Sequence, residues 1–332
     1  MKYPFLEFKN IQGFDFELSD KTDVLQVPEG AKLHLTGGID GKKLYVTQDK
    51  LQAKKASNEL KKYGLKVVTV VGRDDVLLYR KNYSKEQDGL NALNFAKIAK
   101  GDYDVIVTSP DALGDKFCDL KDFENFIVDL EVGKNYNLNV LSNSLVKAGY
   151  KREDEIFDFG DFSIRGDVVD VFPYGVKNPL RLSFFDDELE SIKEIDLESG
   201  DKICEYKTVY LAPSSDLVFT KNSVDEVLAV NKLVGGRVKE IFSELIGGLK
   251  VGALSGRYAY LLPFLKTQSL LDLDLTVIFD EPKIVGEKFE LYDKEFSGRF
   301  KSMEYGGEVT KRHQTAKLAL GDIKDALQGK RL

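Results

Sequence analysis

The sequence predicts an α/β fold in which a parallel-sheet domain is interrupted by an antiparallel α+β insert. Up to about residue 126, buried-strand patterns alternate with helical patterns, the order that builds a parallel sheet with helices on its faces. From residue 127 to 213, short strand patterns follow one another with turn signals between them, as in an antiparallel block. From residue 222 helical periodicity returns, and LDLTVIFDEP at 273–282 reads as one more buried strand.

The first predicted domain covers residues 1–126. Its expected elements are strands at 32–36 (KLHLT) and 43–47 (KLYVT), a helix capped by Asp49 and ended by Gly64, a strand at 66–72 (KVVTVVG), a helix with Leu90, Leu93 and Ile98, and a strand in YDVIVTSPDAL that ends at Pro110. Asp is a preferred N-cap residue, and Gly is preferred just past a helix end, so both helix limits have a physical basis.

The predicted insert, residues 127–213, begins with a helix in NLNVLSNSLVKAGY that Gly149 ends. Its expected strands are DFSIRGD, VVDVFP, LRLSFF, LESIKEID and TVYLAP. We expect residues 214–305 to complete the first domain and residues 306–332 to form a helical tail or linker.

Composition limits the kinds of protein that this chain can be. A length of 332 residues favours more than one domain. A net charge of -7 disfavours a broadly basic nucleic-acid surface, and two cysteines give neither a disulfide framework nor a metal cluster. The N-terminus MKYPFLEFKN does not resemble a signal peptide, and no apolar run is long enough for a membrane span. We expect a soluble cytoplasmic protein, and the uncapped helical pattern at its end predicts a piece of a longer chain.

The glycine-rich stretch LTGGIDGKKLYV invites comparison with a phosphate-binding P-loop, whose pattern is G-x-x-x-x-G-K-[ST]. Placing Gly41 and Lys42 on the pattern puts Lys43 where Ser or Thr is needed to bind magnesium. The other alignment puts Asp40 at the lysine position. In addition, only about six residues separate the two predicted strands, whereas a parallel crossover needs a dozen or more.

VIFDEP resembles the strand that carries the magnesium-binding carboxylates of ATPases. Without a phosphate cradle we interpret these carboxylates as vestigial, and we expect no nucleotide or other cofactor. The residues assigned to this vestigial nucleotide site are Thr36, Gly37, Gly38, Asp280 and Glu281.

The stretch RLSFFDDE places two phenylalanines side by side in a predicted strand. Because successive side chains of a strand point to opposite faces, Phe184 shares the core face with Leu180 and Leu182, and Phe185 shares the other face with Arg181. An exposed aromatic ring beside arginines is typical of a protein interface. In the alternative interpretation a loop covers the ring and the arginines pair with Asp186, Asp187 or Glu188.

The insert resembles the second domain of UvrB and of the transcription-repair coupling factor family, Mfd. The shared positions are Tyr150, Arg152, Gly160, Phe162, Arg165, Gly166, Asp170, Phe172, Pro173, Arg181, Phe184, Phe185 and Glu188. Outside the insert, VIVTSPDAL, YLLPFL and VIFDEP follow in the order of the UvrB-like N-terminal module of Mfd. UvrB keeps an intact P-loop and a long aromatic hairpin, and this chain has neither, so the Mfd module is the better match.

The resemblance implies a degenerate RecA/helicase-like domain with a UvrB domain 2-like insert that recruits UvrA, the damage-recognition ATPase of excision repair, to stalled transcription. The residues implied in UvrA binding are Arg152, Arg165, Arg181 and Phe185. From Tyr150 to Gly200 there are fourteen acidic and six basic residues, which suits salt bridges to a protein rather than a track for phosphates.

The resemblance also implies partners outside this chain. The motor and C-terminal domains of the full-length protein would be one partner, and RNA polymerase and DNA would be reached through those absent domains. This chain would have no enzymatic activity, while the full-length protein would be an ATP-dependent DNA translocase. Two alternatives remain: a UvrB-type ATP-dependent helicase or DNA damage-binding domain, and an intramolecular autoinhibitory module.

Overall fold

The computed structural model describes residues 21, 23–24, 26–73, 77, 84–328 and 330. The N-terminal stretch MKYPFLEFKN, which does not resemble a signal peptide, lies outside the described residues. The chain divides into two compact units, each made of separate stretches of sequence. Unit 1 comprises residues 1–77, 100–117 and 267–332, and unit 2 comprises residues 78–99 and 118–266.

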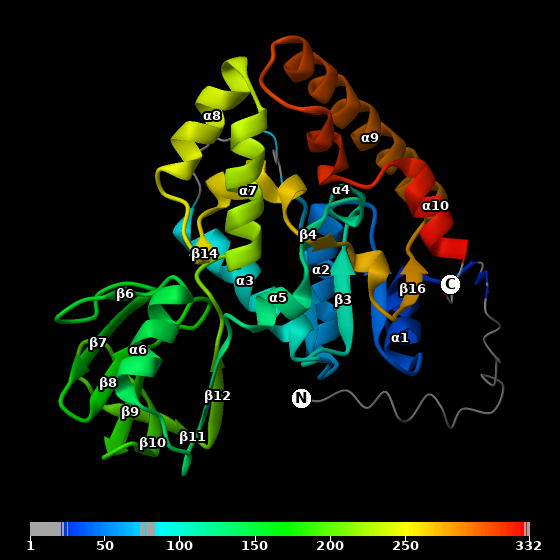
Figure 1. Cartoon of the computed structure of the whole chain (residues 1–332). Helices are drawn as coiled ribbons and strands as arrows, with labels where there is room; N and C mark the ends of the chain where they lie inside the picture. The colour runs from blue at the N-terminus through cyan, green and yellow to red at the C-terminus, as the bar shows by residue number, and fades with distance from the viewer. Residues whose placement is uncertain are drawn as a thin grey trace. The chain divides into compact units, whose positions relative to one another are not determined.

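A four-stranded parallel sheet forms the centre of unit 1 (Figure 1). In spatial order its strands are β16 (Thr276–Phe279), β1 (Lys43–Val46), β3 (Val105–Thr108) and β2 (Val67–Thr69). The central strands β1 and β3 are buried along their whole length, as expected for strands covered on both faces. The predicted strands VIFDEP and VIVTS therefore belong to one sheet, as expected.

The first predicted strand is wrong, because residues 32–36 belong to helix α1 (Glu29–Gly38). A short apolar alternation fits a helix as well as a strand. Here Leu33 packs against the hydrophobic cluster of the sheet, and Thr36, three residues later on the same side of the helix, is buried. The Thr36 hydroxyl donates a hydrogen bond of 2.9 Å to the backbone oxygen of Lys32, one helical turn earlier.

Helix α2 (Lys50–Lys62) follows β1 and has the predicted limits. The Asp49 side chain accepts a hydrogen bond from the backbone N–H of Gln52, and Gly64 has the left-handed φ of 85° that suits glycine past a helix end. The buried side of α2 packs on the sheet in one hydrophobic cluster, which contains Tyr45, Ala53, Ala56, Leu60, Val67, Val105 and Val107.

The remaining elements of unit 1 are mostly helical. They are α4 (Pro110–Leu113), η3 (Leu270–Asp272), α9 (Pro282–Tyr305), η4 (Lys311–Ala316) and α10 (Leu320–Gln328), with short strands β4 (Phe117–Cys118) and β15 (Thr267–Gln268) at the unit boundaries. The long helix α9 contacts α4, η4 and α10. The tail that was expected to be helical therefore packs on α9 as part of unit 1.

A six-stranded sheet with one hydrophobic face dominates unit 2. Its order is β11 (Lys202–Tyr206), β10 (Glu188–Ile195), β9 (Leu180–Phe185), β8 (Val168–Val171), β7 (Asp161–Arg165) and β6 (Lys151–Arg152). All neighbours are antiparallel except β6 and β7, which run parallel. Helix α6 (Leu138–Lys147) lies across the strands in Figure 1 and contributes Leu141 and Leu145 to the same hydrophobic cluster as the buried strand residues.

The other elements of unit 2 flank this sheet in sequence. They are α3 (Lys85–Ala99), α5 (Leu120–Glu124), β5 (Val128–Glu131), β12 (Thr208–Leu211), β13 (Leu217–Phe219), α7 (Lys221–Leu233), α8 (Gly236–Ile246), β14 (Gly252–Leu254) and η2 (Gly256–Phe264). Two further antiparallel pairs form, β5 with β12 and β13 with β14.

The predicted fold class is confirmed, because a parallel sheet and an antiparallel multi-stranded sheet occur in one mixed α/β chain. The two units do not divide the chain at the predicted domain bounds, since residues 214–266 lie in unit 2. The bounds 1–126, 127–213, 214–305 and 306–332 therefore stay a prediction.

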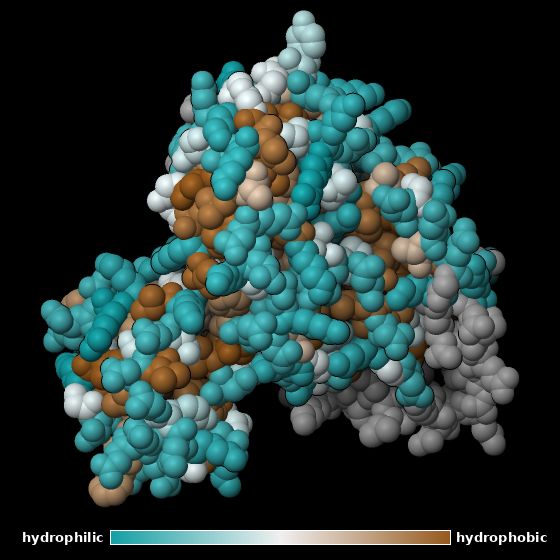
Figure 2. Space-filling view, in the orientation of Figure 1, coloured by the Kyte–Doolittle hydropathy of each residue, from teal (hydrophilic) through white to brown (hydrophobic). Residues whose placement is uncertain are grey.

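The described surface is rich in charge, in keeping with a sequence in which 31% of residues are charged. In Figure 2 hydrophilic residues cover most of the visible face, with hydrophobic patches among them. Within the described ranges, none of the helices has both the length and the apolar composition needed to cross a membrane.

Candidate protein-binding surface

The two adjacent phenylalanines of β9 point to opposite faces of the six-stranded sheet, as the alternation predicted. Phe184 is 5% exposed and belongs to the hydrophobic cluster under α6, whereas Phe185 is 67% exposed. Leu180 and Leu182 are buried on the same side as Phe184. The sheet face away from the hydrophobic cluster therefore presents a large aromatic ring to solvent.

Strand pairing places polar residues on the same face of the sheet as this ring. Residues paired across neighbouring strands share one face of a sheet. Asp170 is paired with Ser163 on one side and with Arg181 on the other. We call this surface the polar face, and its members are Ser163, Arg165, Asp170, Arg181, Ser183 and Phe185.

Asp170 lies at the centre of the polar face and holds both arginines. The Arg181 Nε donates to Asp170 Oδ1 at 2.7 Å, and Arg181 Nη2 donates to Oδ2 at 3.0 Å. Arg165 Nη2 donates to the same Oδ2 at 3.2 Å. The Asp170 side chain is only 2% exposed, and the hydrogen bond to it raises the pKa of Arg181 above its ordinary value. A buried carboxylate thus fixes two partly exposed guanidinium groups.

The arginines do not pair with the carboxylates that the alternative interpretation named. Asp186 and Asp187 form the two-residue turn between β9 and β10, and Asp186 has a left-handed φ of 52°, which aspartate tolerates better than most residues. Glu188 is the strand partner of Phe185. The ring of Phe185 therefore lies at the turn end of the β9–β10 hairpin, and no loop among the described residues buries it.

A loop next to the polar face carries a second exposed aromatic residue that the sequence analysis did not single out. Glu155 lies 3.9 Å from Arg165 Nη1. Two residues further on, Phe157 is 73% exposed. The Asp161 carboxylate accepts hydrogen bonds from the backbone N–H groups of Phe157 and Asp158 at 3.2 and 2.9 Å, which orders this loop.

Arg152 is not brought together with the other predicted site residues. It lies on the two-residue edge strand β6, where its pairing partner is Phe162. Phe162 faces the hydrophobic cluster, so the register puts Arg152 on the opposite face from Arg165 and Arg181. Its side chain is exposed.

The predicted vestigial nucleotide residues are arranged differently from the expectation. Thr36, Gly37 and Gly38 form the C-terminal end of α1, before β1, instead of a turn between a strand and a helix. Because residues 32–36 are not a strand, no six-residue crossover exists here. A phosphate cradle needs the N-terminus of a helix, and these residues lie at the C-terminal end of α1.

The two carboxylates after β16 are already paired within the chain. Lys32 Nζ lies 2.9 Å from Asp280 Oδ1 and 2.9 Å from Glu281 Oε1. Glu281 has a left-handed φ of 57° and is the residue before α9. A lysine of α1 thus supplies the positive charge beside these carboxylates.

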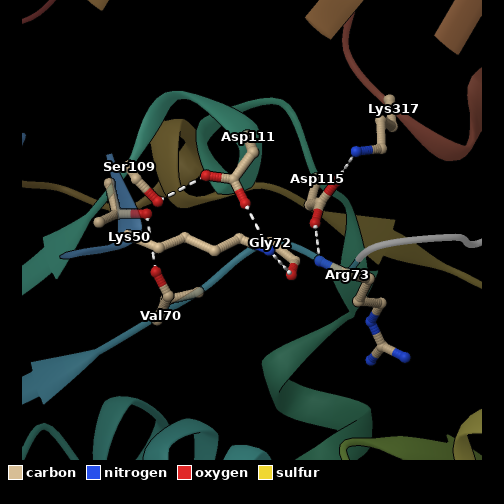
Figure 3. Close-up of polar contacts among 9 residues, drawn as sticks. Lys50, Val70, Gly72, Arg73, Ser109, Asp111, Asp115 and Lys317 are labelled. Atoms are coloured by element: carbon tan, nitrogen blue, oxygen red, sulfur yellow. Dashed lines mark hydrogen bonds and ion pairs between the residues drawn. The ribbon is translucent and has the colours of Figure 1, made fainter. Parts of the chain in front are cut away.

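The carboxyl ends of β2 and β3 carry a polar cluster (Figure 3), in the region where open α/β sheets bind ligands. Asp111 accepts a hydrogen bond of 2.6 Å from Ser109 and lies 3.2 Å from Lys50 Nζ. Asp115 accepts from the backbone N–H of Arg73 at 2.8 Å and pairs with Lys317 at 2.7 Å, while burial raises its pKa. These carboxylates are compensated by the chain's own groups.

Comparison with known proteins identifies the part of the chain that carries the polar face. The model of the family described as the UvrB interaction domain matches residues 128–217. Over these residues the chain is similar to that family. The matched stretch includes β7, β8 and β9, and with them every residue of the polar face.

Two kinds of curated protein are similar to part of this chain. The UvrABC system protein B of Campylobacter hominis is 32% identical over 125 residues, which are 37% of this chain and 19% of that protein. Transcription-repair-coupling factors of Staphylococcus aureus are 31% identical over 105 residues, 32% of this chain and 9% of the relative. The chain is thus similar to UvrB and to the UvrB-like module of a coupling factor, and the match spans under a fifth of these relatives' length.

Proposed function

We propose that this chain is the N-terminal UvrB-like module of a transcription-repair coupling factor, and that its UvrB interaction domain recruits UvrA to stalled transcription complexes in nucleotide excision repair. The observation that carries this proposal is Phe185, a large ring that projects from the same face of the sheet as two fixed arginines. The names of the relatives support the repair setting.

The chemistry of the polar face suits a folded protein partner. Aromatic residues and arginines are the residue types most enriched at the energetic centres of protein interfaces. Arg165 and Arg181 stand among the fourteen acidic residues that lie between Tyr150 and Gly200. We therefore expect UvrA to present carboxylates to the arginines and an apolar pocket to Phe185.

We also propose that this chain does not hydrolyse nucleotide. The proposal is supported by the position of Thr36, Gly37 and Gly38 at the end of a helix and by the pairing of Asp280 and Glu281 with Lys32. In this proposal, contacts to RNA polymerase and DNA belong to further domains of a full-length protein, which would supply the motor.

The experiment is a calorimetric titration of purified UvrA with the chain and with the double variant Arg165→Ala/Arg181→Ala. We expect the wild-type chain to bind and the double variant to lose at least about tenfold in affinity, since truncating a desolvated interface arginine typically costs more than ~1 kcal/mol. Arg299→Ala, which removes an exposed arginine of α9, is the matched control and should bind as the wild type does. Absence of binding by the wild-type chain would overturn the proposal.

A further inference from the structure

We infer that Asp170 is a positioning residue of the polar face, whose buried carboxylate holds Arg165 and Arg181 in the geometry that UvrA recognises. The inference rests on the proposed function, and it concerns a residue that makes no contact with the partner itself. The Asp170 side chain is almost completely buried beneath the two arginines, so its effect on a partner must pass through them.

The position of Asp170 in the sheet separates it from the hydrophobic core. Its strand neighbours Val169 and Val171 are fully buried in the cluster under α6, whereas Asp170 points to the polar face. Burying a carboxylate is unfavourable unless it is paired and hydrogen-bonded. Both of its oxygens are used by the guanidinium groups of Arg165 and Arg181, so these two side chains are what compensates it.

The pairing leaves donors available on both arginines. A guanidinium group has five N–H donors in a planar fork. Arg181 uses Nε and Nη2 toward Asp170, and Arg165 uses Nη2. The Nη1 groups are not engaged by Asp170, although Glu155 lies 3.9 Å from Arg165 Nη1, beyond hydrogen-bond distance. The Arg181 and Arg165 side chains are 35% and 55% exposed. Asp170 therefore orders both side chains while leaving donors for carboxylates of a partner.

Ordering before binding has a measurable consequence. A long side chain that is already fixed loses less conformational freedom when a complex forms. Removing the Asp170 charge makes the polar face more positive, so simple attraction to an acidic partner predicts tighter binding. Loss of the fixed geometry of Arg165 and Arg181 predicts weaker binding to UvrA. The two effects have opposite signs, which makes Asp170→Asn an informative substitution.

The test is the affinity of UvrA for the Asp170→Asn chain, measured by calorimetry together with the melting temperature. We expect binding about tenfold weaker than wild type, because two rotamer-rich side chains must then be ordered on association. Glu205→Gln is the matched control: it removes one negative charge from the same sheet, where Glu205 pairs with Lys202 and does not contact either arginine. This control should bind as wild type or slightly more tightly.

A double-mutant cycle separates positioning from general damage to the fold. In the Arg165→Ala/Arg181→Ala background, Asp170→Asn should cause no further loss of UvrA binding. If Asp170→Asn is too unstable to titrate, Asp170→Glu keeps the charge, shifts the carboxylate by one methylene group, and should also weaken binding. Wild-type or tighter binding by the variants, or an equal loss without the arginines, would overturn the inference. Failure of the wild-type chain to bind UvrA would instead overturn the proposed function and the inference with it.

Discussion

At the scale of single residues, Phe184 and Phe185 are neighbours in β9, yet one is buried and the other projects from the polar face. The sequence RLSFFDDE was enough to assign Phe184 to the core and Phe185 to solvent, because the side-chain period of a strand is two. The role of Asp170 could not be predicted in this way. Its contacts with Arg165 and Arg181 depend on the register of three strands, which a pattern within one strand does not contain.

Gly72 gives a residue-scale prediction about the polar cluster of unit 1. A Cβ at this position would lie 2.2 Å from Asp111 Oδ2 and 2.9 Å from the Asp111 backbone carbon. Gly72→Ala should therefore lower the free energy of unfolding by about 1–3 kcal/mol, as overpacking of a close contact does. Chemical denaturation of both proteins measures the difference.

The matched control for Gly72→Ala is Gly286→Ala, which lies inside α9 with no atom within 4 Å of the added Cβ. Alanine is favoured over glycine in a helix interior, so this variant should gain roughly 0.5–1 kcal/mol. An unchanged midpoint for Gly72→Ala would show that the Asp111 contact is not held tightly.

At the scale of elements, the sequence predicted the limits of α2 correctly from its end signals. It predicted a strand where α1 lies. The limits of α2 followed from Asp49 and Gly64, whose capping roles depend only on local chemistry. Residues 32–36 are five residues of alternating hydrophobicity, and such a short run does not separate the periods 2 and 3.6. The contact between Leu33 and the hydrophobic cluster of the sheet favours the helix over the strand. This is a tertiary contact, so the local sequence does not contain it.

The position of α1 leads to a prediction about nucleotide binding. Among the described residues, Thr36 to Gly38 end a helix instead of beginning one, and Lys32 pairs with Asp280 and Glu281. We therefore expect these residues to bind no nucleotide. Calorimetry with Mg-ATP at millimolar concentration should give no heat of binding, with UvrA as the positive control. A dissociation constant in the micromolar range would instead favour the alternative of a UvrB-type ATP-dependent helicase.

At the scale of the whole molecule, the sequence predicted that an antiparallel block interrupts a parallel sheet, and β16 does return to the sheet of β1 and β3. It did not predict which helices join which unit. Residues 78–99 and 214–266 belong to unit 2, although their helical periodicity is like that of helices in unit 1. Hydrophobic periodicity indicates that a helix has a buried side. It does not indicate which part of the protein covers that side.

We propose at this scale that the polar face, which lies in the region similar to the UvrB interaction domain, recruits UvrA. Phe184 and Phe185 allow a matched comparison, since they are adjacent, chemically identical and on opposite faces of β9. Tyr305, which is 96% exposed at the end of α9, is a control for loss of an exposed aromatic ring elsewhere. Tyr305→Ala should change neither UvrA binding nor stability appreciably.

The most direct measurement is the dissociation constant of UvrA for Phe185→Ala and Phe184→Ala, with the melting temperature of each variant. Phe185→Ala should weaken binding by about 2 kcal/mol or more, roughly thirtyfold, and should melt close to wild type. Phe184→Ala should lose ~3–5 kcal/mol of stability, because it opens a cavity in the cluster under α6. The proposed interface role of Phe185 is contradicted if Phe185→Ala binds UvrA with wild-type affinity and melts as low as Phe184→Ala.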